Sequence, residues 1–279
     1  MTAKFFKWPA ALLVFIIVIS VGTGVSSAQY DQPQPQPTQN APAEKGSGKQ
    51  AGPPINKAEE DAYKAFFAAR TSGPTTQIQL GEEFATKFPQ SHYLAGVYGT
   101  LTTAYFSTGD TDKMFVAGGK ALEINPDNVD VLPLLAMAIP RRVKSTTPDG
   151  AQQMQKAEGY ARHAIELIPT LPKPPEVDDA SFEKAKNDKL SLAHSGLGLI
   201  DINHQKYEDA RTELMQAVQL ASSPDPVDYY LLGNADVQAS YYHDAVAAYE
   251  KCSASGPLVA VCKQRAESAK HDAETKMGR

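Results

Sequence analysis

Most of the chain carries the apolar pattern of amphipathic helices. From Ile55 onward, Ala and Leu recur at spacings of three and four residues among Glu and Lys, and Pro- and Asp-rich breaks separate the runs. No stretch shows the convincing apolar–polar alternation of a half-buried β-strand. The pattern therefore predicts an all-α fold for this part of the chain.

Four of the predicted helical segments share one frame. In three of them a residue near the helix start is followed by a second one seven residues later and by a proline five residues beyond that: Met114, Ala121 and Pro126; Ala157, Ala164 and Pro169; Ala245, Cys252 and Pro257. The fourth segment has Ala210 and Ala217, with its prolines displaced to positions 224 and 226. Small residues on one face let a neighbouring helix approach, and a proline ends a helix because it cannot continue the hydrogen-bond ladder.

A second helix with its own landmark precedes each of these segments. The landmark is a leucine followed by a small residue: Leu101-Thr102, Leu135-Ala136, Leu197-Gly198 and Leu232-Gly233. From the small residue to the first position of the following helix the distance is 12 residues in three units and 21 in the other, so that unit carries a nine-residue insertion, supplied by the segment 140–150. Three landmarks of the last two units agree on a period of 35 residues.

This repeat resembles the tetratricopeptide repeat (TPR), an antiparallel helix pair of about 34 residues with a Leu-Gly, Tyr, Ala, Ala, Pro pattern. The matching residues are Leu101, Tyr105, Gly109, Ala121 and Pro126 in one unit and Leu232, Gly233, Tyr242, Ala245, Tyr249 and Pro257 in another. The chain departs from the family at Gly118 and Ala161, where a large apolar side chain is usual, and at Met114, where Ala is usual. An ordinary helical bundle with proline stops is the alternative interpretation.

The resemblance implies an α-solenoid of about five antiparallel helix-pair (TPR-like) units with a C-terminal capping helix. Within a domain at 57–279, the expected units are 57–90, 91–128, 129–170, 181–224 and 225–257, and the cap is 258–276. Repeats of this kind contact only their neighbours, so such a domain can be long.

In this family a peptide or protein segment binds the concave face, which is formed mainly by the first helix of each unit. The resemblance places the following residues there: Gly99, Thr103, Phe106, Asp130, Leu134, Met137, Ser195, Leu199, Asn203, Tyr230, Asn234 and Gln238. For Leu134, Met137 and Leu199, packing between helices is the alternative. The predicted partner-binding residues are Gly99, Thr103, Phe106, Met137, Ser195, Asn203, Tyr230, Asn234 and Gln238.

No Lys or Arg stands in this row, so we do not expect the groove to clamp the acidic C-terminal tail of a chaperone. A mostly neutral groove suits an extended segment held by apolar pockets and backbone hydrogen bonds.

The N-terminal segment has the pattern of an export signal. Lys4 and Lys7 precede an apolar run at 10–19 and a small-residue stretch that ends at Ala28, which predicts a signal peptide at 1–28. An uncleaved membrane anchor over 5–25 is the alternative, although the continuous apolar run is shorter than the roughly 20 residues of a spanning helix. After cleavage we expect no integral membrane domain, and a periplasmic or cell-envelope location.

Residues 29–56 form a Gln/Pro-rich linker that has almost no large apolar side chain to bury. Such a composition predicts disorder with extended polyproline segments.

The charge balance excludes one class of function. With 27 Lys+Arg against 32 Asp+Glu the net charge is −5, which argues against a general nucleic-acid binder. Arg141, Arg142 and Lys144 form a small basic patch, interpreted as a solvated loop or as a contact for an acidic partner surface.

The sequence contains none of the common catalytic, metal-binding or phosphate-binding motifs that we looked for. The histidines are scattered without a His-Glu-x-x-His spacing, and neither a Gly-x-Ser-x-Gly turn nor a Gly-rich phosphate loop occurs. We therefore expect no enzyme, no catalytic residues, no metal and no cofactor.

The two cysteines predict a disulfide, because exported proteins enter an oxidising compartment. Cys252 lies on the second helix of the last unit, at the small position that faces the following helix. That following helix is the predicted cap, and it carries Cys262. The bridge would link the cap to the stack and stabilise the folded state by about 2–4 kcal/mol.

Together these observations predict a non-enzymatic scaffold or adaptor of the cell envelope that binds a protein or peptide segment in the groove. The stretch from Phe88 to Tyr93 resembles repeats of periplasmic and outer-membrane assembly factors. A regulatory or substrate-recruiting subunit of an envelope enzyme complex, or an envelope assembly factor, is the alternative.

Overall fold

The computed structural model describes residues 56–143, 146, 148–254 and 256–276. The predicted signal peptide at 1–28 lies outside the described residues, and so does the predicted linker at 29–56 except for its last residue. Among the helices of the described part, none combines the length and the apolar character that a membrane crossing requires.

The described part is built from eleven α-helices, joined by turns and two short 3₁₀ segments, and contains no strand. The helices are α1 (Lys57–Ala68), α2 (Pro74–Lys87), α3 (Leu94–Thr108), α4 (Thr111–Ile124), α5 (Leu132–Arg142), α6 (Pro148–Leu167), α7 (Asp179–Asn203), α8 (Tyr207–Leu220), α9 (Pro226–Gln238), α10 (Tyr242–Cys252) and α11 (Val259–Thr275).

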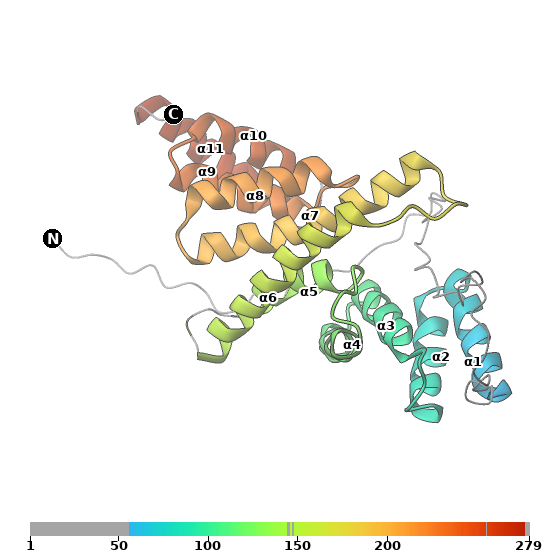
Figure 1. Cartoon of the computed structure of the whole chain (residues 1–279). Coiled ribbons are helices and arrows are strands. Elements are labelled where there is room, and N and C mark those ends of the chain that lie inside the picture. Colours follow the sequence, from blue (N-terminus) through green and yellow to red (C-terminus); the bar gives the residue numbers. More distant parts are fainter. Residues whose placement is uncertain (1–55, 144–145, 147, 255, 277–279) are drawn as a thin grey trace, which may run out of the picture.

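The helices pack in chain order as pairs (Figure 1). The pairs are α1 with α2, α3 with α4, α5 with α6, α7 with α8, and α9 with α10, and α11 packs on α10. Each pair contacts the next one, most extensively where α5 lies against α7. The structure thus confirms an all-α solenoid of five helix pairs with a capping helix.

Three of the first helices end in the same turn. Gly109, Gln205 and Ser240 each adopt a left-handed conformation, with φ angles of 77°, 60° and 67°. In each turn the next residue donates its backbone N–H to a carbonyl five residues back: Asp110 to Tyr105, Lys206 to Asp201, and Tyr241 to Asp236. This is the Schellman arrangement, which satisfies the last carbonyls of a helix while the chain reverses.

The third pair lacks that turn because of its insertion. The residue that follows α5, Val143, is extended, and α6 begins at Pro148 and runs for 20 residues. The segment 140–150 therefore ends one helix and begins the other, so α6 is longer than the second helices of the other pairs.

Small residues set how closely the helices approach. A Cβ atom added to Gly196 would lie 2.4 Å from the carbonyl oxygen of Ala136, so the backbone of α7 meets the backbone of α5 there. One added to Gly198 would lie 2.5 Å from Leu214 Cγ, and one added to Gly233 would lie 2.7 Å from the ring of Tyr249. Inside the pairs α7–α8 and α9–α10, the glycine of the first helix thus accommodates a large side chain of the second.

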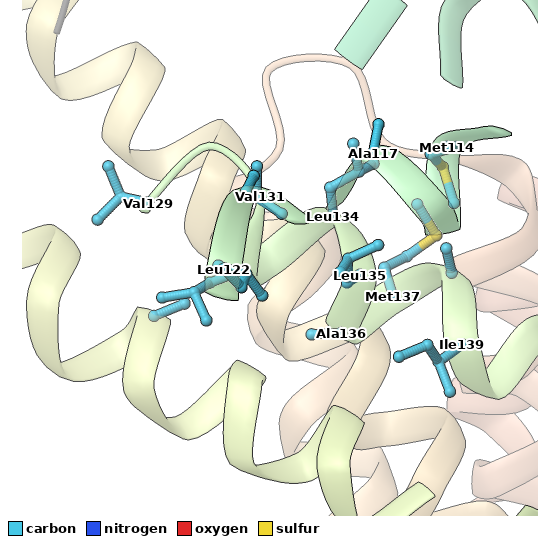
Figure 2. Close-up of a cluster of buried hydrophobic side chains, with 14 of the residues drawn as sticks. Met114, Ala117, Leu122, Val129, Val131, Leu134, Leu135, Ala136, Met137 and Ile139 are labelled. Carbon is cyan, nitrogen blue, oxygen red and sulfur yellow. The ribbon is translucent and has the colours of Figure 1, made fainter. Parts of the chain in front are cut away.

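Gly118 shows the reverse case, since a small residue stands in a second helix where the repeat usually has a large one. Leu135 of the following pair fills this space, with its methyl carbons 3.0 Å from where a Cβ on Gly118 would lie. Side chains of α4 and α5 form one buried cluster at this junction (Figure 2).

Buried side chains form one large cluster that runs from α1 to α7 and two small clusters nearer the C-terminus. Helix α5 lies inside the large cluster, and every residue from Leu132 to Pro140 is buried. The short helix α5 is therefore the centre of the apolar core.

Substitution of two glycines can distinguish the effect of backbone conformation from the effect of side-chain packing. Apart from the adjacent residues and the backbone of the same helix, nothing lies within 4 Å of a Cβ added to Gly109 or to Gly119, but only Gly109 is left-handed. We expect Gly109→Ala to lower the free energy of unfolding by about 1 kcal/mol. Gly119→Ala, inside α4, should raise it by about 0.5–1 kcal/mol. Urea unfolding of both variants measures the difference, and equal effects would contradict the turn assignment.

Gly196→Ala tests the contact between α5 and α7. Its methyl group cannot fit against the carbonyl of Ala136 without a backbone shift, so we expect a loss of about 1–3 kcal/mol. Gly159→Ala is the matched control, because its added Cβ meets nothing within 4 Å on helix α6. Thermal unfolding that affects both variants alike would show that the two helices are not in close contact.

Candidate partner-binding face

The structure divides the predicted partner-binding residues by exposure. Thr103, Phe106, Asn203 and Gln238 are exposed, and Tyr230 and Asn234 are half-buried. Gly99, Met137 and Ser195 are buried. The six accessible residues are called the first-helix face below.

The three buried residues are each enclosed by identifiable neighbours. Met137 is 3% exposed within the core cluster around α5, and Leu134 lies in the same cluster. The amide nitrogen of Asn128 covers Gly99, and Ser195 belongs to a buried polar cluster. Leu134 and Met137 therefore pack between helices. Leu199 is half-buried, which fits either packing between helices or contact with a partner.

The accessible residues come from two separate parts of the stack. Thr103 and Phe106 lie near the end of α3, and the other four lie on α7 and α9, with the buried helix α5 between them in the chain. Phe106 is 47% exposed, which is unusual for a side chain of its size. Gln238 also lines a shallow pocket beside the α7–α8 turn. The other residues that line this pocket are Gln205, Lys206, Tyr207, Glu208, Asp209 and Ala239.

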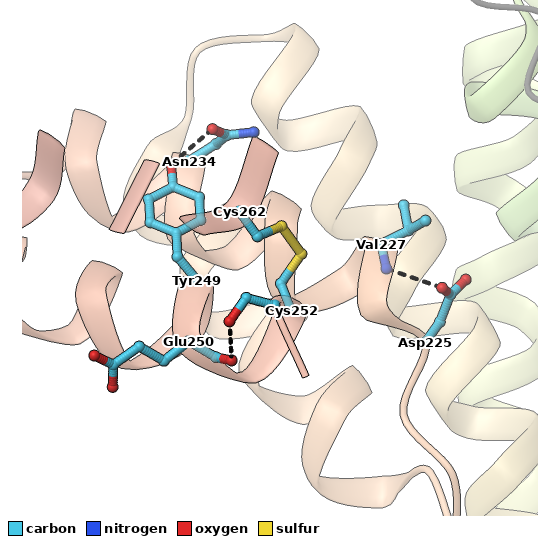
Figure 3. The surroundings of a disulfide bond; sticks show 8 residues. Asp225, Val227, Asn234, Tyr249, Glu250, Cys252 and Cys262 are labelled. Atoms are coloured by element: carbon cyan, nitrogen blue, oxygen red, sulfur yellow. Dashed lines mark hydrogen bonds between the residues drawn. A yellow bond between two sulfur atoms is a disulfide. The ribbon is translucent and has the colours of Figure 1, made fainter. Parts of the chain in front are cut away.

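Asn234 is held in place by a buried tyrosine. Its Oδ1 atom accepts a hydrogen bond of 2.8 Å from the hydroxyl of Tyr249 (Figure 3). Burial raises the pKa of Tyr249, which further favours the protonated hydroxyl that donates this hydrogen bond. Tyr230 lies beside it, with its ring centroid 6.2 Å from that of Tyr249.

A polar cluster joins three first helices next to this face. The guanidinium of Arg141 donates to Asp225 Oδ2 at 2.7 Å and to Asp228 Oδ1 at 2.8 Å. It also donates to the hydroxyl of Ser195 at 3.1 Å, and Ser195 donates in turn to Asp228 Oδ1 at 2.6 Å. Arg141 thereby connects α5 with α7 and α9.

The ends of two helices favour this arrangement. Arg141 stands in the last turn of α5, where the helix dipole favours a cation, and Asp228 stands in the first turn of α9, where it favours an anion. Asp225 caps α9 by accepting from the backbone N–H of Val227 at 2.9 Å (Figure 3). Burial raises the pKa of Asp228, and the adjacent Arg141 opposes that shift.

The predicted basic patch is therefore not a free patch. Arg142 pairs with Asp112 at 2.6 Å, while Arg141 is engaged in the cluster with Asp225 and Asp228. Lys144 lies outside the described residues. Both arginines thus contact acids of other units, and in the case of Arg141 these acids lie 84 to 87 positions away in the sequence.

A second arginine binds the other end of α9. Arg211 of α8 contacts Asp236 at 2.8 Å and Asp244 at 2.6 Å, and its guanidinium lies over the ring of Tyr241. Asp236 is 1% exposed. Burial raises its pKa to about 7, against the opposing effect of Arg211.

The two cysteines lie on adjacent helices. Cys252 ends α10 and Cys262 lies in α11, and the structure joins them by a disulfide with a Cα–Cα distance of 5.9 Å (Figure 3). Both side chains are fully buried.

The described histidines near helix junctions contact acids rather than one another. His163 lies 2.7 Å from Asp127, and His194 lies 2.6 Å from Glu213. In the part of the chain that the structure describes, no three His, Cys, Asp or Glu side chains are grouped so that they could hold a metal.

Comparisons with known proteins concern the fold. No protein-family model matches the chain, and no curated protein matches it. Among solved structures it is similar to a thermophilic TPR protein of Thermus thermophilus, with 16% identity and a TM-score of 0.46 over 76% of this chain and 99% of that one. It is also similar to PilW, a type IV pilus biogenesis factor (12% identity, TM-score 0.48, 80% and 95% of the two chains), and to Acl4, the assembly chaperone of RpL4 (11%, 0.49, 80% and 98%). The fold described above rests on the packing of this chain's own helices.

Asp236 predicts a measurable pH dependence. Because its folded pKa is raised, the stability it contributes is fully present below its ordinary pKa and is lost as the pH rises through about 7. The free energy of unfolding should fall with pH by up to about 1.4 kcal/mol per unit between these limits. Asp236→Asn should flatten this slope in urea unfolding, whereas Asp244→Asn, which removes the exposed partner of Arg211, should keep it. An unchanged slope in Asp236→Asn would show that burial does not control this carboxyl group.

Proposed function

We propose that this protein is a non-enzymatic protein–protein interaction scaffold that binds a segment of its partner through the first-helix face. The observation that carries this proposal is the exposed set of aromatic and amide side chains on first helices, held by a stacked helix-pair framework. Helix-pair solenoids characteristically offer an extended surface for such binding.

The side chains of this face suit an extended peptide. Phe106 and Tyr230 offer large apolar surfaces, and aromatic residues commonly provide much of the binding energy at interfaces. Asn203, Asn234 and Gln238 can donate to or accept from a peptide backbone. None of the six residues is charged, so the face is expected to select by shape and hydrogen bonding more than by charge.

An envelope location is part of the proposal. It rests on the predicted signal peptide at 1–28, which would export the chain. The predicted linker at 29–56 would separate the folded part from the cleavage site or, if 5–25 is an uncleaved anchor, from the membrane. The cysteine pair is consistent with an oxidising compartment, where a disulfide persists.

Two exposed apolar residues provide a matched test of the face. Phe106 lies on first helix α3, and Val116, 59% exposed, lies on second helix α4. In affinity purification from crosslinked envelopes, Phe106→Glu should reduce recovery of the partner at least tenfold, as expected when a charge replaces an aromatic contact. Val116→Glu should leave recovery unchanged.

Circular dichroism and thermal unfolding of both variants control for folding. Loss of the partner only in Val116→Glu would move the binding surface to the second helices. Co-purification of an enzyme whose activity depends on this chain would instead identify a regulatory or recruiting subunit.

A further inference from the structure

Helix α9 contributes two buried carboxylates to its contact with earlier helices, and each one faces an arginine. Asp228 is 7% exposed and contacts Arg141 of α5 and Ser195 of α7, with Asp225 beside it. The other, Asp236, is faced by different groups: Arg211 and Glu208 from α8, and Asp244 from α10.

The apolar contact at the same junction is small. The buried cluster between α8 and the pair α9–α10 consists of Ala210, Leu214, Leu232, Ala235 and Ala248, three of which are alanines, with Ile202, Met215, Val218 and Leu231 partly buried against it. The large core cluster, by comparison, ends in α7. Hydrophobic burial alone therefore leaves little to offset the cost of dehydrating two carboxylates.

The last three helices hold one another by separate contacts. Tyr249 of α10 packs on Gly233 of α9 and donates to Asn234. A third buried cluster joins α10 to α11, and the Cys252–Cys262 disulfide links the same two helices. These contacts do not involve α1–α8.

We propose that α9–α11 form a terminal module that docks on α5, α7 and α8 as one unit, and that Arg141 and Arg211 act as its latches. Each guanidinium compensates one buried carboxylate of α9, so the module remains docked only while neither carboxylate is left charged without its arginine. Helices α1–α7 share the large core cluster and do not require the module in order to remain folded.

The asymmetry of buried ion pairs supports this role. Removing one partner leaves an uncompensated buried charge and is strongly destabilising, whereas replacing both partners by neutral groups is often tolerated. Arg141→Met should therefore release the module, and the additional substitution Asp228→Asn should restore docking. Lowering the pH should also restore docking in Arg141→Met, because Asp228 then becomes neutral.

Hydrogen exchange of the full-length chain, followed by mass spectrometry at pH 7.5, tests the proposal. In Arg141→Met we expect backbone amides of α9–α11 to exchange as a block, roughly 100-fold faster than in the wild type. Protection of α1–α4 should be unchanged. The double variant Arg141→Met/Asp228→Asn should return to within about tenfold of the wild type. Arg211→Met should affect the same block.

Arg162→Met is the control, because Arg162 pairs with Glu158 on the surface of a single helix, α6. It should change nothing. Equal acceleration in all helices of Arg141→Met, no acceleration in α9–α11, or failure of Asp228→Asn to rescue would each overturn the proposal.

Discussion

The approach of α7 to α5 at Gly196 is the contact on which the rest of the structure depends. Because the glycine has no side chain, the α7 backbone reaches the carbonyl of Ala136, and the apolar core that begins at α1 continues into α7. The same approach brings Ser195 beside Arg141, and through this pair α9 is positioned. The docking of α9 in turn positions α10 and α11.

The two halves of the stack are held by different forces. From α1 to α7 most of the buried side chains are apolar and form one cluster, with Leu135 filling the space left by Gly118 (Figure 2). Beyond α7 the clusters are small, and buried aspartates with arginine partners occupy the junction. The C-terminal end therefore combines small apolar clusters with buried ion pairs, while the N-terminal end is held mainly by apolar packing.

The helix pairs could be predicted because their landmarks are local. Leu-Gly pairs, small residues seven apart and prolines at helix ends mark one repeat, and the left-handed turns at Gly109, Gln205 and Ser240 fall at one position of it. The disulfide partners could also be placed, since they lie ten residues apart on consecutive helices. These signals each require only a short stretch of chain.

The exposure of the predicted partner-binding residues could be predicted only in part, because exposure depends on distant segments. The family register places Met137 and Ser195 on the groove, yet α5 is enclosed by its neighbours and Ser195 is bound by Asp228, 33 residues away. In the sequence, Arg141 has the pattern of a basic patch on an insertion. Nothing in its spacing identifies Asp225 and Asp228, from a later repeat, as its partners.

Binding of the partner by the first helices can be tested directly once crosslinking has identified the partner and it has been purified. Hydrogen exchange of the full chain is then measured with and without the partner. We expect protection at the end of α3, at the end of α7 and along α9, where Phe106, Asn203 and Gln238 lie. Protection confined to α4, α6, α8 and α10 would contradict this expectation.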